Sequence, residues 1–236
     1  MRVLGLDTAT RVASVALVED ERVVWERSSQ ASPGHGRMLA RLVEEAFHAA
    51  GWLARDLTRV AVSIGPGSFT GLRIGLGLAK GLAYAARASV VPVPTLSALA
   101  AVAPADPGDL VCPMLDARKG EVYGALFEAR GHGTPAVLQR PALARPQEIL
   151  DSLDGRRCWV LGDGGEVHAT VVQAAAPRGA MLLPFSHYHP QGGMVARLAM
   201  TGPAIAAGQA LAELEPTYVR PSYAAAAAGE PRAVRD

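Results

Sequence analysis

The stretch SIGPGSFTGLRIG, residues 63–75, links a short apolar run to a long helical pattern through a glycine loop. The apolar run, residues 60–64, predicts a buried strand, and the helical pattern continues to about Ala86. Backbone N–H groups at the start of such a helix can hold an anion, so one interpretation of the loop is a phosphate cradle. The alternative is that Ser68 or Thr70 caps the helix and the glycines form the turn. A Walker-type loop is excluded because no Lys-Ser or Lys-Thr pair follows the glycines.

Glycine is frequent within this predicted helix, although each one costs about 0.5–1 kcal/mol relative to alanine. Glycines that lower helix stability in this way are expected only where another group must approach the helix backbone closely. Apart from Arg73 and Lys80 the helix is nearly all apolar, which indicates burial on more than one side. Either the protein's own sheet and a neighbouring helix supply that burial, or a second protein covers one face. The small residues form two stripes at four-residue spacing: Gly71, Gly75 and Ala79, and Gly77, Gly81 and Ala85.

The two halves of the chain repeat one order of elements. In each half the pattern predicts a strand ending in Asp, two further strands, a helix, and a strand that runs into a glycine loop. This order indicates an internal duplication. Paired lobes of this design are typical of the actin, Hsp70 and sugar-kinase superfamily. We therefore expect an α/β fold of two actin-like, ribonuclease H-like lobes, each with a mixed sheet flanked by helices.

The expected boundaries follow from these patterns. The strands are residues 3–6, 13–18, 22–25, 60–64 and 90–93, then 110–115, 121–127, 136–139 and 158–161; helices are expected near 38–47, 97–103, 146–153 and 193–207. We assign residues 1–103 to the N-terminal lobe, 104–190 to the C-terminal lobe, 191–223 to a helix and a strand around Tyr218 that return to the N-terminal lobe, and 224–236 to a flexible tail.

The bulk composition limits what the chain can bind. It has 236 residues, a formal net charge of +1 and a pI near 7.9. It therefore lacks the excess of positive charge with which a protein binds a nucleic acid on its own. Cys112 and Cys158 lie in separate apolar runs, and we expect two buried, reduced thiols. No apolar stretch reaches the roughly 18–20 residues that span a bilayer, and no leader precedes the first strand. We expect a cytoplasmic protein without membrane contact.

Two aspartates, Asp7 and Asp116, each end the first strand of a predicted lobe. In a kinase or ATPase of this superfamily, carboxylates so placed hold a hydrated Mg²⁺ and orient water. Thr8 and Thr10 follow the first aspartate and suit phosphate contacts, and Arg118 follows the second. The alternative, which we favour, is that both aspartates form Asx turns at their strand ends. We therefore interpret these five residues as a vestigial cleft, and expect no catalytic, cofactor-binding or metal-binding residue.

Other candidate sites lack supporting residues. His187 and His189 would face one side of a strand, but no third ligand is evident, and we interpret them as surface histidines. Ser68, Ser97 and Ser186 lack the Gly-x-Ser-x-Gly context of a hydrolase nucleophile. The sequence therefore indicates neither a metal centre nor a hydrolase.

Four motifs, in the right order along nearly the whole chain, resemble those of the TsaB family, also called YeaZ. The most specific is the glycine segment 63–75 with AKGL at 79–82 after it. LGLDTAT at 4–10 resembles the family's opening strand, DARKGEVY at 116–123 its second-lobe hairpin, and EPTYVR at 215–220 its C-terminal motif. On this combination the sequence is identified as a member of the TsaB family.

The resemblance implies a non-catalytic subunit required for the threonylcarbamoyladenosine modification next to the tRNA anticodon. The subunit would scaffold and activate a TsaD-like threonylcarbamoyl transferase, its paralogue, and a TsaE-like ATPase would join the heterodimer. It would contact tRNA only through this complex. The His-x-x-x-His metal pair of TsaD-like relatives is absent here, since Leu39 stands four residues after His35. The competing function is a small ATP-dependent kinase or ATPase of the same superfamily.

The resemblance also implies how the subunit pairs. TsaB-like proteins use the two helices of the first lobe to bind the TsaD-like partner, and can form analogous homodimers. The helix faces that we assign to this interface carry Met38, Leu42, Gly71, Leu72, Gly75, Leu78, Ala79 and Leu82.

Overall fold

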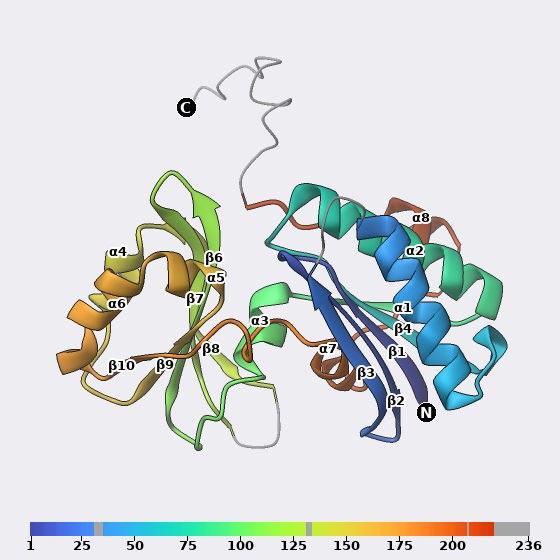
Figure 1. Cartoon of the computed structure of the whole chain (residues 1–236), viewed down its shortest axis with the longest axis horizontal. Coiled ribbons are helices and arrows are strands. Elements are labelled where there is room, and N and C mark those ends of the chain that lie inside the picture. Colours follow the sequence, from blue (N-terminus) through green and yellow to red (C-terminus); the bar gives the residue numbers. More distant parts are fainter. Residues whose placement is uncertain (31–34, 131–133, 207, 220–236) are drawn as a thin grey trace, which may run out of the picture.

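Two five-stranded sheets lie side by side in the protein, each flanked by helices (Figure 1). The computed structural model describes residues 1–30, 35–130, 134–206 and 208–219. Within these ranges the α/β fold with two mixed sheets, expected from the sequence, is confirmed.

The first sheet contains β1 (Arg2–Asp7), β2 (Val12–Glu19), β3 (Arg22–Gln30), β4 (Arg59–Ser63) and β5 (Ser89–Val93). Its strand order is β3-β2-β1-β4-β5. The first three strands form an antiparallel meander, and β4 and β5 extend it in parallel. The central strand β1 is a continuous apolar run up to Asp7, as expected where helices cover both faces of a sheet.

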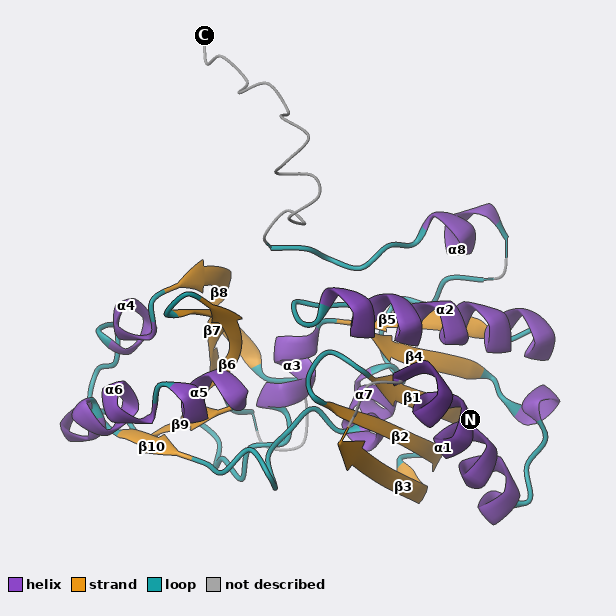
Figure 2. Cartoon of the chain, turned by 45° about the horizontal axis from the view of Figure 1, so that its top comes forward, coloured by secondary structure: helices purple, strands orange, loops and turns teal. Residues whose placement is uncertain are grey.

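The helices on this sheet are α1 (His35–Ala50), α2 (Phe69–Ala86), α3 (Thr95–Ala100) and α7 (Gly192–Leu198), with a short 3-10 helix at Ala54–Asp56. Helices α1 and α2 pack on one face and share a core with Leu4 and Leu6 of β1. Helices α3 and α7 pack on the other face, where Ala98 and Val195 join Val3. Figure 2 shows these layers from a second direction.

The second sheet contains β6 (Leu110–Arg118), β7 (Glu121–Glu128), β8 (Ala136–Ala144), β9 (Cys158–Leu161) and β10 (Ala180–Leu182). Its order is β10-β9-β6-β7-β8, with β6, β7 and β8 antiparallel and β9 and β10 parallel to β6. Starting from the outer antiparallel strand, both sheets therefore have their strands in the order third, second, first, fourth, fifth. The repeated order of strands predicted from the sequence is confirmed.

The second sheet is covered by α4 (Pro146–Leu150), α5 (Asp163–Val167), α6 (Ala169–Ala174) and the 3-10 helix Ala176–Arg178. One core contains Cys112 and Cys158, which are both buried and free, as expected. Burial raises the pKa of both thiols, that of Cys158 to about 12. On the opposite face, Leu96 and Leu99 of α3 pack against Phe127. Helix α3 therefore contributes to the cores of both lobes.

The chain after β10 returns to the first sheet, but not as the sequence predicted. The helix expected at 193–207 ends at Leu198, because Pro203 has no N–H to donate to the carbonyl oxygen of Ala199 and so blocks the next turn. Ile205 instead forms a bridge with Val90 of β5. Helix α8 (Gln209–Glu213) follows, and its Leu211 joins the core that α1 and α2 form with the first sheet. The strand expected around Tyr218 is not formed. The tail expected at 224–236 lies outside the described residues.

Candidate functional site

Asp7, at the end of β1, is completely buried. Its Oδ1 accepts a 3.1 Å hydrogen bond from the N–H of Ala9, which is the Asx turn expected here. Its Oδ2 and the hydroxyl of Ser63, at the end of β4, are both buried without a hydrogen-bond partner among the described residues. Burial raises the pKa of Asp7 to about 7, with the nearby Ser63 hydroxyl and the Ala9 N–H acting in the opposite direction. This carboxyl group therefore does not face solvent, where a hydrated cation would bind.

The two threonines after Asp7 are also engaged within the first lobe. The Thr8 hydroxyl donates a 2.8 Å hydrogen bond to the carbonyl oxygen of Gly71 in α2. The Thr10 hydroxyl accepts a 3.1 Å hydrogen bond from the Val12 N–H. Both side chains are buried, so the turn between β1 and β2 is packed against the start of α2.

The glycine loop is a capped turn. Ser68 Oγ accepts a 3.2 Å hydrogen bond from the Gly71 N–H, and the Ser68 N–H donates to the carbonyl oxygen of Ala9 at 2.7 Å. Of the two capping residues that the sequence offered, the structure therefore uses Ser68 and not Thr70.

The second hairpin repeats the Asx turn. Asp116 Oδ1 accepts a 2.8 Å hydrogen bond from the Arg118 N–H, and its Oδ2 lies 3.2 Å from the Arg118 guanidinium. The Asp116 N–H in turn donates to Asp163 Oδ1 of α5 at 3.1 Å. The five residues of the predicted vestigial cleft thus lie in two turns, one in each lobe, and each aspartate is committed to its own turn.

The histidine pair has a different environment from the one expected. His187 is exposed, and its Nδ1 lies 3.0 Å from the Ser186 hydroxyl. His189 is only 9% exposed, and its ring packs 5.9 Å from that of Phe185. Burial lowers the pKa of His189. The interpretation of both as surface histidines is therefore wrong for His189. No group of three His, Cys, Asp or Glu side chains suited to a metal occurs among the described residues.

The first small-residue stripe of α2 faces the protein's own interior. A Cβ added at Gly71 would overlap the backbone of Thr8, and one at Gly75 would overlap its side chain. Leu72 and Ala79, on the same side of the helix, are also buried from solvent. Five of the residues that the sequence assigned to the interface are buried in the isolated chain, and their assignment stays a prediction: Leu42, Gly71, Leu72, Gly75 and Ala79.

The second stripe faces outward. A Cβ at Gly77 or Gly81 would meet nothing within 4 Å, and Tyr84 is 78% exposed. These residues share one side of α2 because helical residues three and four apart lie on the same face. We call this side the outer face of α2: Ile74, Gly77, Leu78, Gly81, Tyr84 and Ala85. Of the remaining residues assigned to the interface, Met38, Leu78 and Leu82 are half-buried.

A side-chain cluster at the start of α2 was not anticipated. The Arg73 guanidinium lies 4.1 Å from the ring centroid of Phe69, and its Nε donates a 2.9 Å hydrogen bond to the Tyr218 hydroxyl. Further along the helix, Lys80 Nζ donates to the carbonyl oxygen of Ala212 at 2.8 Å. The C-terminal segment therefore covers the side of α2 that carries its two charges. The four-residue spacing of Phe69 and Arg73, which places both side chains on one side of a helix, could have predicted the contact between them.

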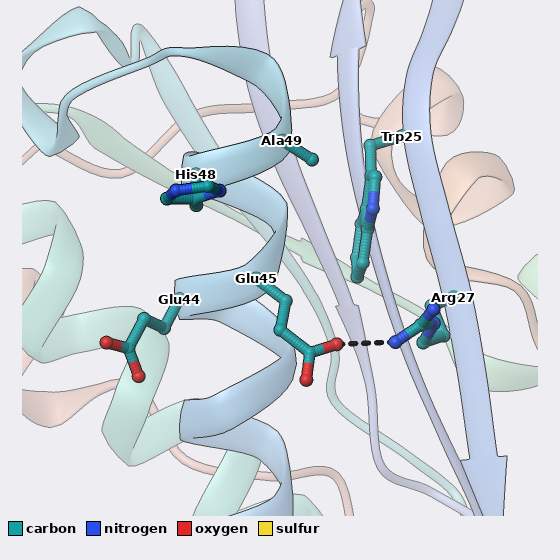
Figure 3. Close-up of a pocket in the computed structure, with 6 residues that line it drawn as sticks. All are labelled: Trp25, Arg27, Glu44, Glu45, His48 and Ala49. Carbon is teal, nitrogen blue, oxygen red and sulfur yellow. Dashed lines mark hydrogen bonds and ion pairs between the residues drawn. The ribbon is translucent and has the colours of Figure 1, made fainter.

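A shallow groove of about 410 Å³ lies between β3 and α1 (Figure 3). Its walls are Trp25 and Arg27 on the strand and Glu44, Glu45 and His48 on the helix, with Ala49 beside them. Arg27 Nη1 lies 2.6 Å from Glu45 Oε2 and spans the groove. An ion pair within the protein therefore already joins its two walls.

Two lobes, each built on a five-stranded sheet with the strand order 3-2-1-4-5, define an actin-like fold. Comparison with known proteins supports this class and narrows it. The family model described as "TsaD: tRNA N6-adenosine threonylcarbamoyltransferase" matches residues 27–158, more than half of the chain. The structure of YeaZ from Pseudomonas aeruginosa matches with a TM-score of 0.77 and 25% identity, over 92% of this chain and 99% of that one.

Relatives found by sequence identify the family more closely. The chain is 35% identical to the tRNA threonylcarbamoyladenosine biosynthesis protein TsaB of Escherichia coli K12, over 68% of this chain and 70% of the relative. It is 30% identical to the protein of the same name in Bacillus subtilis 168, over 73% and 76%. The chain belongs to the TsaB family, within the wider group of TsaD-related proteins that the family model describes. The family predicted from the sequence motifs is confirmed.

Proposed function

We propose that this chain is a non-catalytic subunit that scaffolds and activates a TsaD-like threonylcarbamoyl transferase during the modification of tRNA. The observation that carries the proposal is the burial of Asp7, whose carboxyl group is committed to an Asx turn. An enzyme of this superfamily would present this carboxylate to a hydrated cation. Asp116 is likewise committed to its own turn with Arg118.

We infer that the outer face of α2 receives the partner. Its glycines leave room for a second helix to approach closely, and the half-buried leucines beside them add apolar surface. Tyr84, at 78% exposure, offers the large aromatic anchor that often carries binding energy in an interface. The start of α1 adjoins this face, since Gly36 lies near Ile74. A homodimer through the same face would compete with the heterodimer.

The near-zero net charge supports an indirect contact with tRNA. Non-specific affinity for nucleic acid comes mainly from Lys and Arg side chains that displace counterions, and a chain with a formal net charge of +1 has little such field. In this proposal, tRNA is held by the complex with the TsaD-like subunit, and a TsaE-like ATPase joins that complex.

The proposal is tested by titrating the full chain against a TsaD-like protein. Gly81→Leu and Ala85→Leu place bulk on the outer face of α2, and Ala174→Leu makes the same change at an exposed position of α6 in the other lobe. We expect the first two variants to weaken the complex about tenfold or more, since overpacking a contact costs roughly 1–3 kcal/mol, while Ala174→Leu binds like the parent. Unchanged binding of both α2 variants would remove the outer face from the interface.

The competing function is tested with the isolated chain. We expect the isolated chain, without any partner protein, to hydrolyse Mg-ATP no faster than background. ATP hydrolysis that Asp7→Ala abolishes would instead favour a kinase or ATPase of the same superfamily, whatever the result of the titration.

A further inference from the structure

The turn between β1 and β2 reaches across to the second lobe through Arg11. The Arg11 Nη2 atom lies 3.0 Å from Oε2 of Glu166, which belongs to α5 of the second lobe. These residues are 155 positions apart in the chain. The side chains are 54% and 36% exposed, so the ion pair lies at the surface of the junction between the lobes.

A third element meets this ion pair. The Arg11 guanidinium carbon also lies 4.6 Å from the ring centroid of Phe185, in the segment that leads from β10 back to α7. Phe185 is 1% exposed, and its N–H donates a 2.8 Å hydrogen bond to Oε1 of Glu166. One carboxylate therefore binds the first lobe with one oxygen and the connecting segment with the other.

A separate apolar contact joins the lobes at α3. Leu96 and Leu99 pack with residues of the second sheet such as Phe127, whereas Ala98 packs with the first sheet and α7. Contact at one helix restrains the relative orientation of the two lobes less than contacts at two separate places do. Arg11 supplies a second contact, away from α3.

We propose that Arg11, Glu166 and Phe185 form an interlobe clasp that fixes the orientation of the two lobes. The Arg11–Glu166 ion pair of the clasp is partly exposed, so the clasp opens at far lower cost than the apolar cores within each lobe. Asp163 of α5 also interacts electrostatically with Arg11 and adds to the attraction. Release of Arg11 leaves α3 and the connecting segments as the links between the lobes, and a wider range of orientations becomes accessible.

The clasp is tested by measuring the distance between the lobes in the full chain. Cys112 and Cys158 are buried and do not compete for a thiol-directed spin label. The labels are placed by His48→Cys on α1 and Gln173→Cys on α6, both exposed helix positions in different lobes. Pulsed electron paramagnetic resonance then gives the distance distribution, with labelled chains diluted in unlabelled protein so that only distances within one chain are recorded.

Two variants open the clasp in different ways. Arg11→Ala removes the ion pair and the ring contact, while Glu166→Gln keeps an acceptor for the Phe185 N–H but removes the charge. We expect Arg11→Ala to lower the ratio of clasped to open chains about tenfold, and Glu166→Gln to lower it less. Both changes should broaden the distance distribution, and about 1 M salt should broaden that of the parent because an exposed pair is screened.

The control removes a matched ion pair within one lobe. Arg156 Nη1 lies 2.8 Å from Glu128 Oε2, and Arg156 Nε lies 3.0 Å from Asp154 Oδ2. The Arg156 and Glu128 side chains are 43% and 35% exposed, so Arg156→Ala removes the same charge as Arg11→Ala at similar exposure and at least as many ion pairs. We expect the control to keep the parent's distribution. The proposal is overturned if Arg11→Ala and Glu166→Gln both keep it as well, or if Arg156→Ala broadens it equally. Near-ultraviolet circular dichroism verifies that each variant is folded.

Discussion

The hydroxyl of Thr8 donates a 2.8 Å hydrogen bond to the carbonyl oxygen of Gly71, and this contact sets which side of α2 faces inward. The turn after β1 packs so closely on the first turns of the helix that side chains larger than glycine cannot be accommodated there. Gly77 and Gly81, on another side of the same helix, have no such neighbour. Two chemically identical stripes therefore have different surroundings, one against the turn after β1 and the other in open space.

Replacing these glycines by alanine should separate the two stripes. Gly75→Ala places a methyl group against Thr8, and we expect it to lower the free energy of unfolding by roughly 1–3 kcal/mol. Gly77→Ala, the matched control in open space, should raise it by up to about 1 kcal/mol through helix propensity. Urea unfolding of both variants measures the difference. Equal effects of the two changes would contradict this division of the helix.

The N-terminal cap of α2 gives a second prediction. Because Ser68 Oγ accepts the hydrogen bond of the Gly71 N–H, Ser68→Ala should lower the free energy of unfolding by about 1 kcal/mol. Thr70→Ala changes an exposed hydroxyl in the first turn that is not the cap, and should have a smaller effect. Thermal unfolding of the two variants side by side tests the assignment. A larger loss in Thr70→Ala would show that the capping residue was misassigned.

Local patterns were sufficient for most strands and for the two aspartate turns. Apolar runs bounded by turn residues predicted the strands of both sheets, and β10 was missed because three residues, Ala180–Leu182, are too few to show a pattern. The Asx turns at Asp7 and Asp116 depend only on neighbours two positions away, so they too could be predicted.

Contacts between distant residues could not be predicted in this way. Both glycine stripes have the same spacing, and what distinguishes them is the contact with Thr8, which lies 63 positions from Gly71. The same holds for the pairing of Arg11 with Glu166. The early end of α7 is different, because Pro203 is a local signal in the sequence that predicts a helix end and outweighs the apolar helical pattern around it.

The start of α7 is anchored by a side chain from β3, which gives a third prediction. Glu26 Oε1 accepts a 2.8 Å hydrogen bond from the Gly193 N–H, so a carboxylate lies where the helix N-terminus favours negative charge. We expect Glu26→Ala to lower the free energy of unfolding by about 1 kcal/mol and Glu26→Gln, which keeps an acceptor, by less. Urea unfolding at low and high salt tests this, because only the charge-dependent part should shrink with salt. Identical losses for both variants at all salt concentrations would argue against a contribution from the charge.

The last prediction concerns the dependence of stability on pH through Asp7. Burial raises the pKa of this carboxyl group from its ordinary 3.8 to about 7 in the folded chain. Between these two values the folded chain retains a proton that the unfolded chain has lost, so the contribution of Asp7 to stability falls as pH rises and is fully lost above about pH 7. Asp7→Asn stays neutral at every pH and can still accept the Ala9 N–H with its side-chain oxygen. We therefore expect the variant to be more stable than the parent at pH 8, by at most about 4 kcal/mol, and to differ much less at pH 4. Urea unfolding of both proteins at pH 4, 6 and 8 measures the change. A stability difference that stays constant with pH, or that grows toward acid, would show that Asp7 is ionised in the folded chain.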